Sequence, residues 1–170
     1  GLDYAAISQE LEKLITYLGP DGRKIGVDDI REAVGRSSSQ TIFDFCDAVI
    51  DGNSAQAISA LADLIRSERE VLSIQSTLAT QLRRLMAARV LLDRGSTQDE
   101  AATTLSAGNP KMKWRESKAA AQASRLTQAQ IAAMLSRIAR ADLDIKTGAM
   151  SQNLAMEVLV SDLCVQQKLR

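Results

Sequence analysis

The stretch from Thr127 to Cys164, TQAQIAAMLSRIARADLDIKTG followed by AMSQNLAMEVLVSDLC, decides the fold of the C-terminal part of the chain. Its first half is predicted to be a helix, because Thr127 and Gln130 form a capping box and Gly148 ends the apolar pattern. Its second half, from about Asn153, is apolar on nearly every side, which is typical of a helix enclosed by other helices. We therefore expect the apolar side chains of this half to form the centre of the C-terminal part: Leu154, Met156, Val158, Leu159, Val160 and Leu163.

Seven further segments show the apolar spacing of three and four residues that is typical of amphipathic helices. We predict these helices at about residues 3–18, 27–34, 41–50, 54–66, 71–93, 98–105 and 110–125. Ser96 or Thr97 is expected to cap the helix that starts at residue 98, and Pro110 suits the first position of the next helix. Nine helices joined by short turns leave no room for a sheet, so the sequence predicts an all-α fold.

The composition is that of an ordinary globular protein, with 45% apolar and 25% charged residues in a chain of 170. There is no histidine, so the commonest general base and the commonest metal ligand are both missing. Cys46 and Cys164 lie in apolar helical stripes, and we expect buried, reduced thiols in a cytoplasmic setting. No apolar run approaches the length of a membrane span and no leader opens the chain, so we expect no membrane contact.

Charge is divided unevenly along the chain although the net charge is zero. Residues 1–66 carry 6 Lys and Arg against 11 Asp and Glu, whereas residues 67–170 carry 15 against 10. Such an asymmetry indicates two units with different surroundings. The sequence Ser67-Glu-Arg-Glu70 is the best boundary between them, so we predict a small helical domain over residues 1–66 and a five-helix bundle over residues 71–170.

The segment KMKWRESK, residues 111–118, is the most suggestive candidate for contact with an anion. It places Lys111, Arg115 and Lys118 on one side of a predicted helix, and Lys113 is a further candidate cation in the same segment. This basic face could bind phosphate groups or an acidic partner. The default interpretation is a solvated basic face with Trp114 in the core. The preceding turn resembles that of a helix-turn-helix, but the second helix lacks a base-reading start.

No group of residues assembles a catalytic or metal-binding constellation. Asp142 and Asp144 point roughly opposite ways on a helix, so they cannot easily share a metal ion. Their spacing instead predicts helix-surface ion pairs of Asp144 with Arg140 and of Asp142 with Lys146. Without histidine or a lysine–serine pair, the serines and threonines are expected to be caps and surface residues. The sequence thus predicts a non-enzymatic chain with no cofactor.

Five stretches of the chain, taken in order, resemble the lid and collar portions of the bacterial DNA polymerase III delta subunit, a clamp-loader subunit. These stretches are ISQELEKLITYLG (7–19), IGVDDIREAVG (25–35), FDFCDAVIDGNSAQAISALADLI (43–65), LSIQSTLATQLRRLMAARVLL (72–92) and ADLDIKTG…NLAMEVLVSDLC (141–164). The resemblance covers almost the whole chain.

The resemblance implies an architecture and a set of partners. Members of that family have an N-terminal domain of the AAA+ type, a small helical lid and a helical collar that joins the subunits into a ring. Residues 1–66 would then be the lid and residues 71–170 the collar, in a chain that lacks the N-terminal domain. The implied role is assembly with the delta-prime and tau/gamma subunits during sliding-clamp loading in DNA replication. The clamp itself would be touched only through the absent domain.

The candidate contacts with other subunits are basic residues that lie off the apolar stripes. They are Arg83, Arg84, Arg89, Arg137, Arg140 and Lys146. Two alternatives remain open beside assembly. One is a stand-alone DNA-binding module on the helices predicted at 98–105 and 110–125, and the other is a helical regulatory adaptor without nucleic acid.

Overall fold

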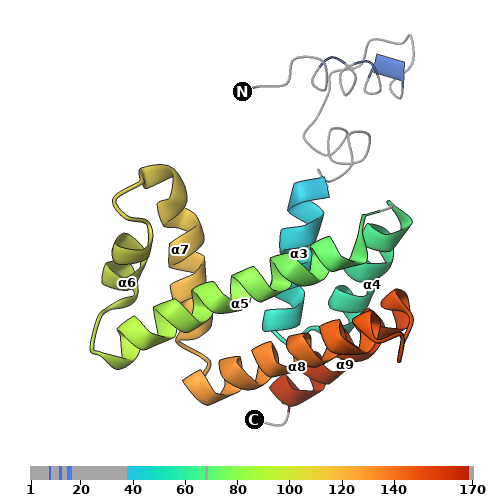
Figure 1. The fold of residues 1–170 in the computed structure, drawn as a ribbon. Helices are drawn as coiled ribbons and strands as arrows, with labels where there is room; N and C mark the ends of the chain where they lie inside the picture. Colours follow the sequence, from blue (N-terminus) through green and yellow to red (C-terminus); the bar gives the residue numbers. More distant parts are fainter. Residues whose placement is uncertain (1–7, 9–11, 13–14, 17–37, 68, 169–170) are drawn as a thin grey trace. The chain divides into compact units, whose positions relative to one another are not determined.

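The computed structural model describes residues 8, 12, 15–16, 38–67 and 69–168, and it divides the chain into two compact units, residues 1–41 and 42–170. Within those residues the secondary structure is helical, which confirms the all-α prediction (Figure 1). The helices are α3 (Ser38–Ile50), α4 (Ser54–Arg66), α5 (Val71–Asp93), α6 (Gln98–Leu105), α7 (Pro110–Ala123), α8 (Gln128–Lys146) and α9 (Gln152–Lys168). The helix predicted at 27–34 falls outside the described residues, as does the one predicted at 3–18 apart from residues 8, 12 and 15–16.

Local capping chemistry fixes where α6 and α8 begin. Thr97 and Glu100 form a capping box at the start of α6. Thr127 and Gln130 form another at the start of α8, where the Thr127 amide donates to Gln130 Oε1 at 2.8 Å. Each box satisfies amide groups that a helix start leaves unpaired. Both capping predictions are confirmed, and Gly148 follows α8 with a φ of 73°, a conformation that glycine adopts without strain.

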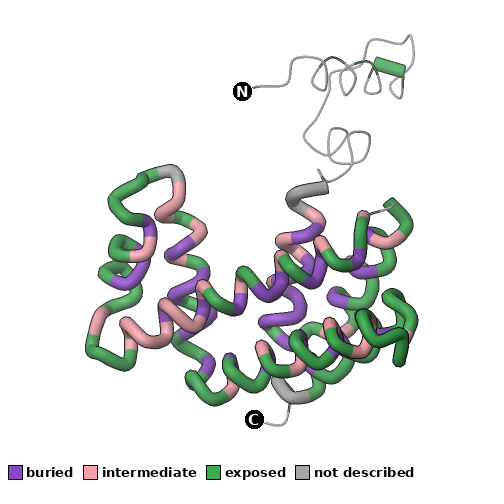
Figure 2. Tube along the Cα trace, viewed as in Figure 1, coloured by how far each residue is buried: buried purple, intermediate pink, exposed green. Residues whose placement is uncertain are grey.

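Helix α5 lies at the centre of the second unit. It crosses the unit and packs against α6, α7, α8 and α9 (Figure 1). One face of it is buried from Val71 to Ala88, as the purple segments of Figure 2 show. That face is formed by Ile74, Leu78, Leu82 and Leu85, as the apolar spacing predicts. Burial of such side chains contributes about 1.5–3 kcal/mol each, so this helix organises the core.

One hydrophobic core joins the helices on both sides of residues 67–70. It includes Phe45 and Val49 of α3, Leu61 of α4, Leu82 of α5 and Met156 of α9. Helix α4 packs directly against α9, although the two are far apart in sequence. The division into a lid domain (1–66) and a collar domain (71–170) stays a prediction, and within residues 42–170 the packing is continuous across that boundary.

Helix α9 is not enclosed on all sides, so that prediction was wrong. Met156, Leu159, Val160 and Leu163 are buried, but Leu154 is 49% exposed and Val158 is 40% exposed. The two exposed residues are four apart, so they share one face of the helix. Among the described helices, α9 packs mainly against α4, α5 and α8, and these leave that face uncovered.

Both cysteines are buried, as predicted. Burial raises the pKa of the Cys46 thiol to about 12, and repulsion from Asp47 adds to the effect. The thiol therefore stays neutral at ordinary pH and behaves as an apolar group. Among the described helices, none is both long enough and apolar enough to cross a membrane.

Candidate functional site

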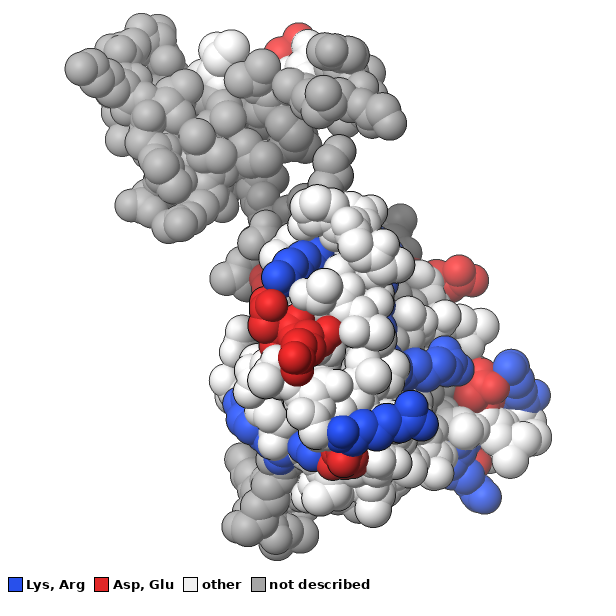
Figure 3. Space-filling model, turned by 90° about the vertical axis from the view of Figure 1, so that its left-hand side faces the viewer, with Lys and Arg blue, Asp and Glu red and all other residues white. Residues whose placement is uncertain are grey.

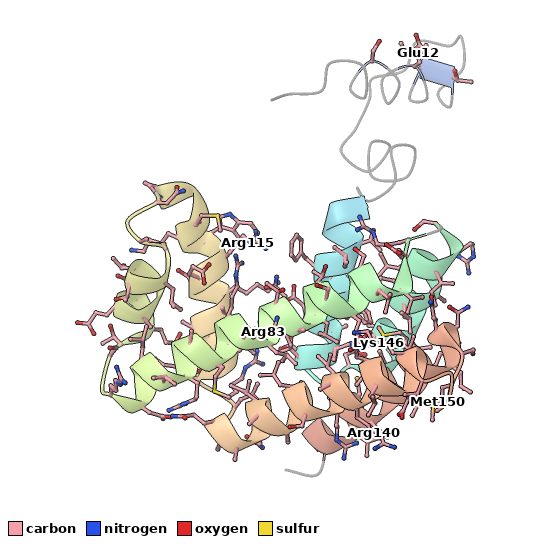
Figure 4. The ribbon with its side chains drawn as sticks, in the orientation of Figure 1. Glu12, Arg83, Arg115, Arg140, Lys146 and Met150 are labelled. Carbon is pink, nitrogen blue, oxygen red and sulfur yellow. The ribbon has the colours of Figure 1, made fainter. Side chains whose placement is uncertain are left out.

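Helices α5 and α8 lie side by side in opposite directions and leave a groove between them, here called the α5–α8 groove. Its volume is about 480 Å³. Each wall repeats the same helical spacing, with Leu72, Gln75, Ser76, Ala79 and Arg83 from α5 and Leu135, Ile138, Ala139, Asp142 and Lys146 from α8. Two of the predicted interface residues, Arg83 and Lys146, therefore line the same groove (Figure 4).

A smaller groove of about 140 Å³, here called the α8–α9 groove, lies on another face of α8. It is lined partly by Arg137 and Arg140, with the exposed Val158 beside them. Arg137 pairs with Asp162 at 2.7 Å, which ties α8 to α9. Arg140 pairs with Asp144 at 3.1 Å. Four of the six predicted interface cations thus lie along two grooves that share α8.

The other two predicted interface cations, Arg84 and Arg89, are directed toward α7. Arg84 lies 3.7 Å from the buried carboxylate of Glu116. Arg89 donates to Asp93 and to the Ala123 carbonyl oxygen. Hydrogen bonds from Arg89 and Gln128 hold the pKa of Asp93 below its ordinary value. These arginines connect helices within the chain, and whether they or the other four contact another subunit stays a prediction.

The basic face of α7 is occupied by contacts within the chain. Lys118 and Gln122 both donate to Asp47 on α3, and Arg125 pairs with Asp51 at 2.8 Å. The Arg115 guanidinium lies 4.5 Å from the centre of the Phe43 ring, and Figure 4 shows it reaching from α7 toward α3. We call this set of contacts the α3–α7 seam. Sequence reasoning missed it, although Phe43, Asp47 and Asp51 repeat at a four-residue spacing that signals one helix face.

Among the remaining cations of this segment, the one with a described side chain is also paired within the chain. Lys113 pairs with Asp99 of α6 at 2.9 Å, and the side chain of Lys111 is outside the described residues. Burial and the neighbouring Arg84 lower the pKa of Arg115. Figure 3 shows acidic and basic side chains intermixed on the face that includes α6 and α7. Phosphate contact by Lys111, Lys113, Arg115 and Lys118 stays a prediction, and three of these cations already have partners in the chain.

Trp114 does not lie in the core, so the expectation that placed it there was wrong. Its side chain is 66% exposed. Its neighbour Arg115 is directed to α3, and the next residue along, Glu116, is buried beside Arg84. Because consecutive residues are about 100° apart around a helix, those two contacts leave Trp114 facing outward.

The two aspartates of α8 behave as the spacing predicts. Asp142 accepts from Lys146 at 2.6 Å, and Asp144 accepts from Arg140 on a different side of the helix. In the described part of the chain, no three acidic or cysteine side chains gather in a way that could hold a metal ion. The carboxylates of α8 therefore serve as ion-pair partners on the rims of the two grooves.

Comparison with known proteins identifies the family to which the chain is similar. The family model of the DNA polymerase III delta subunit, C-terminal domain, matches residues 39–163. The DNA polymerase III subunit delta of Bacillus subtilis strain 168 is 25% identical over 159 residues. The solved structure of the Bacillus subtilis DNA clamp loader delta protein superposes with a TM-score of 0.70 at 23% identity, over 95% of this chain. The matched part of this chain spans only 44% of the length of the Bacillus subtilis delta sequence and 46% of the length of the solved delta structure.

Proposed function

Because this chain belongs to the family of DNA polymerase III delta subunits, we propose that its helical unit anchors it in a clamp-loader assembly through helix-to-helix contacts with other subunits. The family match covers α4 to α8 entirely and most of α3 and α9. The Bacillus subtilis relative is described as a DNA clamp loader delta protein, and its fold is shared by this chain. The proposal transfers that assembly role to the domain that the two proteins have in common.

The observation that carries the proposal is the surface around α8. Two grooves run along this helix; the exposed Val158 lines one of them, and Leu143 of α8 and Leu154 of α9 are also exposed apolar side chains. Apolar groups that stand among charged rims are typical of surfaces that bind another protein. The rim charges are largely paired within the chain, so the contact would be driven by apolar burial, with charges giving orientation.

We propose that this unit has an architectural role and catalyses no reaction. The described side chains include buried thiols, paired carboxylates and capping hydroxyls, each of which has a structural partner or environment. The proposed partners are the delta-prime and tau/gamma subunits, and contact with the sliding clamp is assigned to a domain that precedes this one in the family. The proposed setting is the cytoplasm.

The proposal is tested by mixing the chain with purified delta-prime and tau/gamma subunits and following the complex by size-exclusion chromatography. We expect the chain to elute with the other subunits at micromolar concentration. Elution of the chain alone under those conditions would contradict the proposal. Persistence of the complex at raised salt is expected, because burial of apolar surface is not screened by ions.

The alternative of a DNA-binding module on α6 and α7 finds less support in the geometry. Lys113 and Lys118 are paired with Asp99 and Asp47, and Arg115 stacks on Phe43. A DNA-binding surface would need cations available to release counterions from phosphates. A regulatory adaptor without nucleic acid would use the same grooves for a different partner, and the mixing experiment separates it from the clamp-loader proposal.

A further inference from the structure

We propose that the α5–α8 groove receives one amphipathic helix from another clamp-loader subunit, and that this helix carries an Asp or Glu at the end that lies beside Arg83. The inference rests on the proposed function and makes it specific. It names the surface, the form of the segment that binds and the charge that orients it.

The length of the groove fits about three turns of helix. On α5 the lining residues run from Leu72 to Arg83, and on α8 they run from Leu135 to Lys146. At 1.5 Å per residue each wall is about 16 Å long. Both walls repeat at intervals of three, four and seven residues, so the lining side chains form two parallel rows that a third helix can pack between.

The cross-section of the groove also favours a helix. Small side chains line its middle, at Ser76, Ala79 and Ala139, while Leu72 and Leu135 stand toward its ends. Small residues let the axis of an incoming helix approach closely, and the leucines offer apolar contact to its flanks. The one amide in the lining, on Gln75, already donates to the Ile138 carbonyl oxygen at 2.9 Å. The floor therefore offers apolar contact and few free polar groups for a small polar ligand.

The charges on the rim orient the incoming helix. Because α5 and α8 run in opposite directions, Arg83 and Lys146 lie toward opposite ends of the groove (Figure 4). Lys146 is neutralised by Asp142 at 2.6 Å. Arg83, by contrast, is exposed and forms no ion pair with any side chain that the structure describes. A carboxylate at one end of the bound helix would complete that pair, since guanidinium groups favour carboxylates.

Two substitutions test the groove against a matched control. Ala139 is exposed, so Ala139→Trp fills the groove with little effect on folding, which thermal unfolding checks. We expect it to weaken binding to the mixture of delta-prime and tau/gamma subunits by about 100-fold, by blocking the close approach. Arg83→Glu should weaken binding by about tenfold. Arg94→Glu makes the same charge change at the exposed end of α5, outside the groove, and should leave affinity within about twofold.

Cross-linking identifies the occupant. Because both native cysteines are buried, a cysteine introduced by Leu72→Cys at the end of the groove can be labelled selectively with a maleimide photocrosslinker. We expect a cross-link to a helix of another subunit, and changing an acidic residue of that helix to Lys should restore binding to Arg83→Glu. The same label at exposed Ala133→Cys, which does not line the groove, should not capture that helix.

The outcomes separate this inference from the proposed function. Suppose that the unmodified chain binds the other subunits and that Ala139→Trp and Arg83→Glu bind them equally well. The groove is then not the binding site, while the assembly role stands. A cross-link to a second copy of this chain, or to residues 1–41 of the same chain, would also overturn the inference. If the unmodified chain does not bind the other subunits, the proposed function and the inference both fall.

Discussion

Trp114 illustrates how a single side chain depends on its neighbours. It is the only tryptophan in the sequence, and its side chain is two-thirds exposed on α7. Composition favours a buried position for such a large apolar residue. The contacts of Arg115 with α3 and of Glu116 with α5 turn the helix so that Trp114 faces outward.

Substituting Trp114 should therefore have little effect on stability. We expect Trp114→Ala to change the free energy of unfolding by less than about 0.5 kcal/mol, as at other exposed positions. The comparison variant is Met134→Ala on the buried face of α8, which should cost about 2–5 kcal/mol. Urea unfolding of both variants measures the difference. A cost for Trp114→Ala as large as that for Met134→Ala would show that the indole is packed.

The Cys46 thiol gives a pH dependence with a defined sign. Its pKa is raised in the folded chain to about 12, so between pH 9 and pH 12 the unfolded chain loses a proton that the folded chain keeps. The free energy of unfolding should then fall with rising pH, by about 1.4 kcal/mol per pH unit from this group. Below pH 9 the contribution is fully present. Unfolding titrations of the chain and of Cys46→Ala isolate it, because the variant should lack this part of the slope.

At the scale of elements, the start of α8 is set by local chemistry. The Thr127 hydroxyl oxygen accepts from the backbone N–H of Gln130 at 3.2 Å, and the side-chain oxygen of Gln130 accepts from the backbone N–H of Thr127. Thr127→Ala should cost about 1 kcal/mol of stability, the usual contribution of an N-cap. Thermal unfolding checks the value, and Thr127→Ser, which keeps the hydroxyl, should be close to the unsubstituted chain. Equal stability of all three would contradict a role for the cap.

The α3–α7 seam makes a second prediction at this scale. Asp47 accepts from both Lys118 and Gln122, so Asp47→Asn should weaken the charged part of the seam. We expect a loss of about 0.5–1 kcal/mol at low salt and a smaller loss at high salt, because ions screen partly exposed pairs. Asp63→Asn removes a partner of Arg66 within α4 and serves as a control outside the seam. Salt-independent loss in Asp47→Asn would indicate that charge is not what matters there.

These elements also show what the sequence can and cannot predict. Capping boxes and apolar stripes depend on residues within a few positions of each other, so the bounds of α4, α5 and α6 follow from the sequence. The exposure of Leu154 and Val158 depends on which neighbours α9 meets, which no local pattern specifies. The sequence likewise predicts a basic surface on α7, because the partner carboxylates lie about 70 residues away, at Asp47 on α3 and at Asp51 just after it.

At the scale of the whole molecule, the second unit has a continuous core and an uncovered surface. Helix α5 packs against α6, α7, α8 and α9, and α4 packs against α9, while the grooves along α8 remain open. The sequence predicts only a set of separate interface cations and no groove. In the structure, Arg83 and Lys146 line one groove, whereas Arg84 and Arg89 form ion pairs within the chain. Their grouping depends on how α5 and α8 pack, so it required the structure.

The central claim is that this unit assembles with other clamp-loader subunits, and sedimentation velocity tests it most directly. The chain would be titrated into a fixed concentration of delta-prime and tau/gamma subunits. We predict a single faster-sedimenting species that contains the chain in fixed stoichiometry and saturates at micromolar concentration. Independent sedimentation of the chain across the whole titration would contradict the account.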